Sequence, residues 1–585
     1  MRPSTRIRPA RAVSPAIAGR QALRHPLVTT LLAVLVWAAM LRLSNVGDMS
    51  VWGLVGAVSP IILLAPLVAM AAFTVSLLRG QSDGVLTTHI AGIILMLYGA
   101  GAMVGNSVQA RIVLRHEGIT DQVLRSGSID PTIDAYFNWP GFFTFFAYVR
   151  EVSGIESFAA AGIWVPVFLN LAFLAPLLVI FRYATADRRI VWTSVLLFYI
   201  GNWIGQDYFA PQAVAYCLHL TMVAILLHYY DRPATAVANR FARAAHLVVV
   251  MLLFLAIVPS HQLTPPLTIV SVIGLVVADR CSARRLPHFM VGVFLTWLVF
   301  MSSTYLAGNL SKMLELVGDV GAAAGANVTE RVGGSAAHRL VVILRLAFTG
   351  LFGLLAAFGL FRKRNALERS DRGMLVLAVV PTVLIALQPY GGEMVLRVFM
   401  FTLPFVAFYA AHAIRWDGGS ARGRFVAQWI IAVPAVVVLT LLFMVARYGN
   451  AALDQFSSDE RNAINIVYED APPGSLLLVA VDNVAWKYRG YDTYDHRSID
   501  RVVRSEIDPR VYASAAVSLM YQRRDAGAYF IATESQQSYI DLLGGLPSEA
   551  LRAIEEQLNG DPNIQILVDR PTIRIYRLPP DGEES

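Results

Sequence analysis

Long apolar stretches follow one another along the chain from residue 27 to residue 446. A helix of about 20 apolar residues crosses the hydrocarbon core of a bilayer, so each stretch predicts one membrane span. Hydrophobic residues make up 56% of the sequence and charged residues only 15%, which excludes an ordinary soluble protein. The thirteen predicted spans lie at 27–44, 54–79, 86–106, 160–181, 190–205, 209–230, 245–259, 265–279, 287–308, 337–361, 373–388, 395–414 and 424–446.

Arginine and lysine residues gather on one side of these predicted spans. With thirteen spans, every basic cluster falls on the same side as the N-terminus, and the opposite loops are poor in positive charge. The positive-inside rule therefore predicts a cytoplasmic N-terminus and an extracytoplasmic C-terminal region in the plasma (inner) membrane. Contact with anionic headgroups accounts for the basic charge, so no nucleic-acid partner is expected. The clusters lie at 2–24, 182–189, 232–243, 280–285, 362–372 and 415–424.

The composition predicts three regions. Residues 1–26 mix arginine with proline, serine and alanine and predict a disordered cytoplasmic tail rather than a cleavable signal. Residues 27–446 form the transmembrane module. Residues 447–585 predict a small extracytoplasmic α/β domain, because β-rich runs at 475–481, 528–533, 564–568 and 572–578 alternate with helix signals such as Asp508-Pro509. The two cysteines, Cys217 and Cys281, imply neither a structural disulfide nor a cysteine-based metal site.

The predicted outer loop 107–159 is too long for a simple connection and carries several acidic residues. Its first half contains His116, Glu117 and Asp121, and the two carboxylates share one face if this segment is helical. Such carboxylates can act as a general base or hold a divalent cation, and the alternative is a solvated loop. The second half contains Asp134 and Trp139 in an aromatic segment that predicts a short interfacial helix.

Two tight turns on the predicted outer side carry further polar residues. The turn at 201–212 holds Gln206, Asp207 and Gln212, with Trp203 and Tyr208, at the edge of the hydrocarbon. Polar groups at that depth usually face a cavity or a partner, although Asp207 can equally cap a helix. The turn at 259–266 contains His261, which can donate to a phosphate, move a proton or serve a structural role.

Two arginines lie near the outer ends of later spans. Arg397 follows Glu393 by four residues at the start of a span, so the two can pair, or Arg397 can bind a phosphate. Arg345 lies several residues inside another span and needs a carboxylate, a cavity or a lipid phosphate. No phosphate loop, dinucleotide glycine pattern, zinc spacing or serine-histidine-aspartate order is visible, so a sugar donor would be lipid-linked.

Together these features resemble the GT-C superfamily of polytopic membrane glycosyltransferases. The motif His116-x-Gly118-x-x-Asp121, followed by the aromatic run from Tyr136 to Phe143, is similar to the acidic outer loop of bacterial members. The turns from Asp207 to Gln212 and from Ser260 to Pro265 are similar to those of uncharacterised actinobacterial relatives. In this chain the acidic loop follows the third predicted span, whereas in typical members it follows the first.

The resemblance implies inverting transfer of a sugar from a polyprenyl-phosphate donor to an extracytoplasmic glycan, lipid or protein. It implies a general base for which Asp121 is the first candidate, before Asp134, Asp207 and Glu117. It implies phosphate neutralisation by Arg397, His261 and Arg345, and a divalent cation such as Mg²⁺ or Mn²⁺ is compatible but not required. The remaining implied substrate-binding residues are His116, Trp139, Trp203, Gln206, Tyr208, Gln212 and Glu393.

Three other classes remain open from the sequence. A polysaccharide polymerase or ligase also has many spans, but usually has one large late loop, whereas 309–336 is rich in small residues. A transporter places polar residues at mid-membrane and often has internal repeats, which are not visible here. A non-catalytic scaffold would use the C-terminal region to recruit partners.

Overall fold

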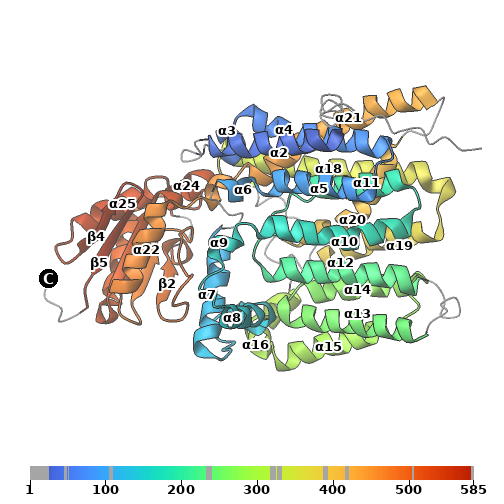
Figure 1. Ribbon diagram of the computed structural model, residues 1–585. Helices are drawn as coiled ribbons and strands as arrows, with labels where there is room; N and C mark the ends of the chain where they lie inside the picture. Colours follow the sequence, from blue (N-terminus) through green and yellow to red (C-terminus); the bar gives the residue numbers. More distant parts are fainter. Residues whose placement is uncertain are drawn as a thin grey trace, which may run out of the picture.

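The structure is a computed structural model that describes residues 25–44, 49, 52–104, 110–231, 240–315, 325, 332–386, 393–415, 421–503 and 506–580. It consists of a helical bundle followed by a smaller α/β domain (Figure 1). Nearly all of the predicted N-terminal tail lies outside the described residues, as do Gly391 and Gly392 before Glu393.

Each of the thirteen predicted apolar stretches contains a helix of the bundle. Apolar side chains on all faces let these helices pack against one another and against lipid. The helices are α2 (Pro26–Arg42), α4 (Pro60–Leu78), α5 (Asp83–Tyr98), α10 (Val165–Ala184), α11 (Arg188–Gly201), α12 (Pro211–Tyr230), α13 (Arg240–Ser260), α14 (Thr264–Val277), α15 (Leu286–Phe300), α18 (Ala336–Lys363), α19 (Arg369–Val379), α20 (Met394–Ile414) and α21 (Ala421–Tyr448).

Six of the described helices are long and apolar enough to cross a membrane, and the number is eight if each of two bent helix pairs is one span. The protein is therefore a helical membrane protein, and the count of thirteen spans stays a prediction. Helices α5 and α14 are apolar but shorter, and α19 passes into the 3-10 segment η6 (Val380–Ala386), where Pro381 lacks an amide hydrogen.

Short helices connect or flank the bundle at one end. Helix α7 (Ala110–Ser126), the 3-10 turn η1 (Ala135–Asn138) and α8 (Gly141–Ser153) make up most of the predicted acidic loop. Helix α8 exposes Phe145, Tyr148 and Val152, in agreement with the predicted aromatic helix. The other short helices are α3 (Gly53–Ala57), α6 (Ala100–Met103), α9 (Ala159–Gly162) and α16 (Ser303–Glu315).

The C-terminal domain contains a five-stranded sheet in the order β2-β1-β3-β5-β4. Strand β1 (Leu476–Val479) is parallel to β2 (Asp495–Ser498) and β3 (Ala528–Thr533), whereas β5 (Ile573–Leu578) is antiparallel to β3 and β4 (Gln565–Arg570). Apolar side chains of both sheet faces pack under the helices. The helices are α22 (Ser458–Asp470), α23 (Pro509–Tyr521), α24 (Glu534–Leu543) and α25 (Ala550–Asn559).

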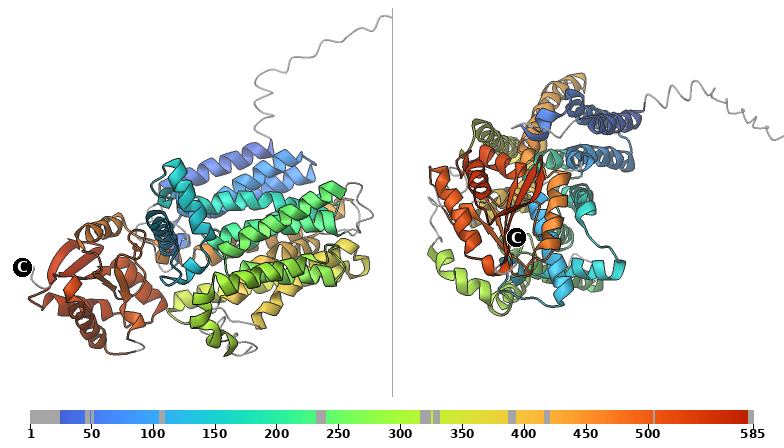
Figure 2. Two further views of the ribbon diagram at one scale, coloured as in Figure 1. Left: turned by 90° about the horizontal axis from the view of Figure 1, so that it is seen from below. Right: turned by 90° about the vertical axis from the view of Figure 1, so that its left-hand side faces the viewer.

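The four predicted β-rich runs coincide with β1, β3, β4 and β5, and Asp508 caps α23 as predicted. The last bundle helix, α21, ends at Tyr448, so Arg447 lies inside it rather than in the domain. The domain lies at one end of the bundle, where α7 and α8 are also found, and the turn between α10 and α11 lies at the opposite end (Figures 1 and 2).

Helix α7 contacts the C-terminal domain at several points. Gly118 lies so close to the domain that a Cβ atom there would be 1.8 Å from the carbonyl oxygen of Lys487. The Arg111 guanidinium lies 3.3 Å from the Asp482 carboxylate, and Gln122 donates to Asp492 at 2.5 Å. The glycine of the His-x-Gly-x-x-Asp motif therefore permits close docking of the domain.

Candidate functional site

A cavity of about 250 Å³ lies at the end of the bundle that faces the C-terminal domain. Its walls come from α7, η1, the turn before α12, the turn between α13 and α14, and the start of α20. Segments that are far apart in sequence thus meet around one space, which we call the small cavity. Eight of the residues predicted from the sequence line it: His116, Asp134, Trp139, Gln206, Tyr208, Gln212, His261 and Arg397.

His116 is a buried histidine held in one orientation. Its Nδ1 lies 2.8 Å from the Phe209 carbonyl oxygen, which can only accept, so Nδ1 carries the hydrogen. Its ring stacks on Tyr208 at 5.9 Å, and burial lowers the pKa of His116 to about 4. The imidazole is therefore neutral near pH 7, and Nε2, which has no hydrogen-bond partner among the described residues, remains an acceptor.

His261 is also neutral. Its Nδ1 accepts from the backbone amide of Thr264 at 3.3 Å, so the hydrogen lies on Nε2. Burial, followed by the positive charge of Arg397, lowers the pKa of His261 to about 3. At neutral pH this side chain can donate a hydrogen bond but carries no charge.

Several buried donors on the wall of the small cavity have no hydrogen-bond partner among the described residues. They are Nε1 of Trp139, Nε2 of Gln212, and Nε and Nη1 of Arg397. Buried donors in folded proteins are nearly always satisfied by protein groups, ordered water or a ligand, so these donors are able to hold oxygen acceptors inside the cavity. Because Arg397 carries a full positive charge, an anion such as a phosphate fits best.

Arg397 is fixed by the first turn of α20. Its Nη2 donates to Glu393 four residues earlier, which is one of the two predicted alternatives. The Arg397 side chain is 9% exposed and the Glu393 side chain is 41% exposed. One edge of the guanidinium is thus held by Glu393, while Nε and Nη1 are left for a ligand.

Asp134 is the predicted carboxylate that reaches the small cavity. Its Oδ1 accepts from the Tyr136 amide at 3.0 Å and thereby caps η1, and its Oδ2 accepts from the Tyr491 hydroxyl at 2.9 Å and from Arg115. Arg115 also donates to the Tyr491 hydroxyl at 2.9 Å. The C-terminal domain therefore helps to position the carboxylate.

Arg115 and Tyr491 were missed by the sequence analysis. Arg115 precedes the His-x-Gly-x-x-Asp motif directly, and its place on the same helix turn as His116 is a signal that could have been used. Tyr491 belongs to the Tyr-Asp-rich run from Tyr488 to Asp495, whose composition is typical of a solvated loop. Only the docking of the two domains identifies Tyr491.

A second cavity of about 530 Å³ adjoins the first and extends between the bundle and the C-terminal domain. Gln206 lines both cavities, and Glu393 lines the second while its partner Arg397 lines the first. Arg345 donates from Nε to the Ala446 carbonyl at 2.7 Å and lies 5.5 Å from the centre of the Trp203 ring. Trp203, Arg345 and Glu393 are therefore placed in this second cavity, together with Tyr539 and Asn483 of the domain.

Three predicted carboxylates line neither cavity. Glu117 and Asp121 share one face of α7, as predicted, and both lie 3.5 Å from Arg150 of α8. Glu117 also accepts from the Phe158 amide at 3.2 Å, and burial raises the pKa of Glu117. Asp121 pairs with Arg125 at 2.8 Å. These contacts hold α7 against its neighbours, and a catalytic role of either carboxylate stays a prediction.

Asp207 is the third of these carboxylates. It is buried inside the bundle, 2.9 Å from Arg447 and 2.6 Å from the amide nitrogen of Asn170. Removal of one partner of such a buried ion pair leaves an unpaired buried charge and strongly destabilises the folded protein. Asp207 thus ties α10, the turn before α12 and α21 together.

The described residues contain no group of three or more histidine, cysteine, aspartate and glutamate side chains arranged to hold a metal ion. The carboxylates named above are instead engaged by arginines. Dependence on Mg²⁺ or Mn²⁺ stays a prediction that a chelator tests.

Comparisons with known proteins give similarity in structure only. The chain matches no known family and no curated protein sequence. AglB, an oligosaccharyltransferase from Archaeoglobus fulgidus solved with an inhibitory peptide and a dolichol-phosphate, overlaps 81% of this chain and 71% of its own chain, at 11% identity and a TM-score of 0.49. ArnT from Cupriavidus metallidurans, solved with undecaprenyl phosphate, overlaps 84% of this chain and 97% of its own, at 14% identity and a TM-score of 0.46.

These neighbours are GT-C glycosyltransferases, the superfamily that the motifs of this chain resemble. Both TM-scores lie below 0.5 and both identities are 14% or lower, so neither similarity carries an activity over to this chain.

Proposed function

We propose that this chain is a membrane glycosyltransferase that moves a sugar from a polyprenyl-phosphate donor to an extracytoplasmic acceptor. The observation that carries the proposal is the cluster of buried, unpaired donors around Arg397 in the small cavity. A cavity with one charged guanidinium, further donors and a neutral histidine acceptor suits a phosphate linked to a hydroxylated ring.

The proposed roles divide the cavity into a phosphate part and a sugar part. Arg397 and His261 hold the phosphate, Trp139 and Gln212 donate to the oxygen-rich ligand, and Nε2 of His116 accepts from a sugar hydroxyl. The second cavity, which shares Gln206 with the first, supplies room for the acceptor.

The reaction forms a bond between the acceptor oxygen and the anomeric carbon of the sugar and breaks the bond from that carbon to the phosphate oxygen. The leaving phosphate keeps the electron pair, and Arg397 stabilises its added charge. The acceptor proton passes to a carboxylate. Asp134 replaces Asp121 as the proposed base, because Asp134 lines the small cavity and Asp121 lines neither cavity. Attack from the face opposite the phosphate gives inversion.

The orientation belongs to the same proposal. The N-terminus lies in the cytoplasm, and the small cavity and the C-terminal domain lie outside the plasma membrane. The gathering of basic clusters at the other ends of the predicted spans supports this orientation.

Binding of undecaprenyl phosphate to the purified full-length protein tests the phosphate part of the proposal. Arg397→Gln should weaken binding by about tenfold or more, because hydrogen bonds to a charged partner contribute about 1.5–3 kcal/mol. Arg552→Gln is the matched control, since Arg552 is an exposed arginine of the C-terminal domain with a side chain that is 81% exposed. Equal affinity of the wild-type and Arg397→Gln proteins would overturn the proposal. Adding EDTA to the wild-type assay measures whether a divalent cation also takes part.

A further inference from the structure

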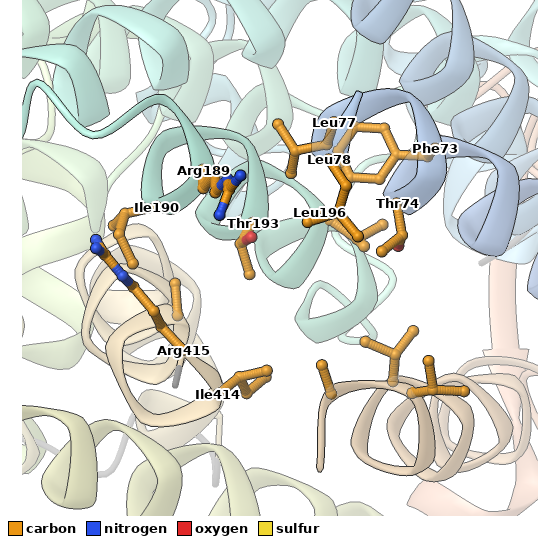
Figure 3. A pocket seen from close by; sticks show the side chains of 14 residues that line it. Phe73, Thr74, Leu77, Leu78, Arg189, Ile190, Thr193, Leu196, Ile414 and Arg415 are labelled. Atoms are coloured by element: carbon orange, nitrogen blue, oxygen red, sulfur yellow. The ribbon is translucent and has the colours of Figure 1, made fainter. Parts of the chain in front are cut away.

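A groove lies among four helices near the turn between α10 and α11 (Figure 3). That turn lies at the end of the bundle opposite the C-terminal domain (Figure 1). Helices α4 and α11 form one wall, and α20 and α21 form the other. Most of its lining is apolar, with Leu77, Leu196, Ile414 and Val436 as representative residues. We call it the far groove, because nothing in the proposed reaction uses it.

The size of the far groove limits what it can hold. Its enclosed space is about 50 Å³, compared with about 250 Å³ for the small cavity. It has no room for a sugar ring or a nucleotide. A slender hydrocarbon chain that lies partly in the groove and partly in the bilayer matches its apolar lining and its small enclosed volume.

The arginines around the groove differ in whether a carboxylate pairs with them. Arg182 and Arg188 each lie 2.7 Å from Asp83, and Arg415 pairs with Asp187. Arg189, beside Thr193 on the groove wall, is exposed and makes no ion pair with any residue that the structure describes (Figure 3). Among the residues that the structure describes, Arg189 is thus a groove guanidinium without a carboxylate partner.

We expect Arg189 to lie at the headgroup level of a bilayer, because it lies at one end of an apolar helix of the bundle. It lies in the first turn of α11, within the basic cluster 182–189, and the groove continues from it toward the middle of the helices. Anionic headgroups are attracted to arginines at this level, and the acyl chains of the same lipid extend into the hydrocarbon.

We propose that the far groove binds one anionic phospholipid, with an acyl chain against Leu196 and Ile414 and the phosphate at Arg189. The lipid fills the space between the α4–α11 wall and the α20–α21 wall. This site is independent of the proposed glycosyl transfer.

The test is retention of lipid by the full-length protein, measured by native mass spectrometry with phosphatidylglycerol and phosphatidylcholine of identical chains. The wild-type protein should retain phosphatidylglycerol about fivefold better, as expected for one surface arginine. Arg189→Gln should lower retention of phosphatidylglycerol to the level of phosphatidylcholine. Arg79→Gln, which removes an exposed arginine at the end of α4 outside the groove, should retain the wild-type preference.

A second variant tests the apolar part of the site. Thr193→Phe fills the groove without a change of charge and should reduce retention of both lipids. Equal retention of the two lipids by the wild-type protein, or equal losses in Arg189→Gln and Arg79→Gln, would mean general surface attraction and would overturn the proposal. Unchanged retention in Thr193→Phe would also overturn it.

Discussion

The small cavity combines a charged arginine with two histidines whose burial keeps them neutral. Arg397 is charged and His116 is neutral because their surroundings differ. Arg397 has the Glu393 carboxylate beside it, whereas His116 lies among aromatic rings and next to a carbonyl oxygen. Protonation of His116 would place a further positive charge in a cavity that Arg115 and Arg397 already line. The neutral form leaves Nε2 able to accept a hydrogen bond.

The lowered pKa of His116 predicts a loss of stability in acid. The pKa is about 6.5 in an unfolded chain and about 4 in the folded protein, so the stabilisation is complete above pH 6.5 and is lost as pH falls toward 4. At pH 5 the loss relative to pH 7.5 is about 2 kcal/mol, from about 1.4 kcal/mol per pH unit. The decrease in Tm between these pH values should therefore be smaller in His116→Gln than in the wild-type protein. An equal decrease in both would contradict a buried neutral His116.

At the scale of elements, α7 connects the small cavity to the C-terminal domain. One face of α7 carries His116 to the cavity, and Arg115 reaches both Asp134 and Tyr491. Gly118 allows the backbone around Lys487 to approach, and this approach brings Tyr491 to Asp134. The position of the Asp134 carboxylate therefore depends on the docking of the C-terminal domain.

Gly118→Ala should separate the domain from the bundle. The new Cβ atom would lie 1.8 Å from a backbone oxygen, which cannot rotate away as a side chain can. Overpacking of this kind costs about 1–3 kcal/mol, so we expect a lower Tm and faster proteolysis in the 449–457 connection. Gly350→Ala on α18 is the control, because a Cβ there would meet nothing within 4 Å. Equal protease resistance of the wild-type and Gly118→Ala proteins would contradict the docking role.

The sequence predicts elements whose signals are local. Each apolar stretch contains a helix because its whole length is apolar, and four strands follow from β-rich runs. Strand β2 was missed because Asp495, His496 and Arg497 lack the apolar residues that mark a strand. Helix α22 was missed although Ser457 and Glu460 form a capping box at its start.

Part of the candidate site was predictable because its residues lie in turns that local sequence signals identify. Tight turns between apolar stretches fix His261, Gln212 and Arg397 at one level, and the small cavity brings them together. Which carboxylate reaches the cavity was not predictable. Arg150 engages Glu117 and Asp121, and Arg447 engages Asp207, through contacts between segments distant in sequence.

For the whole molecule, the functional proposal requires the two ends of the helical bundle to face opposite sides of the membrane. The C-terminal domain and α7 lie at one end of the bundle, and the turn between α10 and α11 lies at the other (Figure 1). Positive charge at the second end favours the cytoplasm.

Single-cysteine labelling of intact cells tests this orientation. After replacement of Cys217 and Cys281, a membrane-impermeant maleimide should label Ser128→Cys and Gln537→Cys directly. Ala186→Cys, in the turn between α10 and α11, should be labelled only after the membrane is opened. Labelling of positions 128 and 186 from the same side would contradict the proposed orientation.

The most direct test of the proposed activity is mass spectrometry of envelope glycans from a strain whose only copy of the gene encodes Asp134→Asn. The account predicts loss of the same sugar as in a deletion strain, because the variant keeps the shape of the side chain but removes the base. Asp121→Asn, expressed at the same level, should retain that sugar because Asp121 lies outside the small cavity. Wild-type glycans in the Asp134→Asn strain, when the deletion strain lacks a sugar, would contradict Asp134 as the base, and wild-type glycans in the deletion strain itself would contradict the proposed transfer.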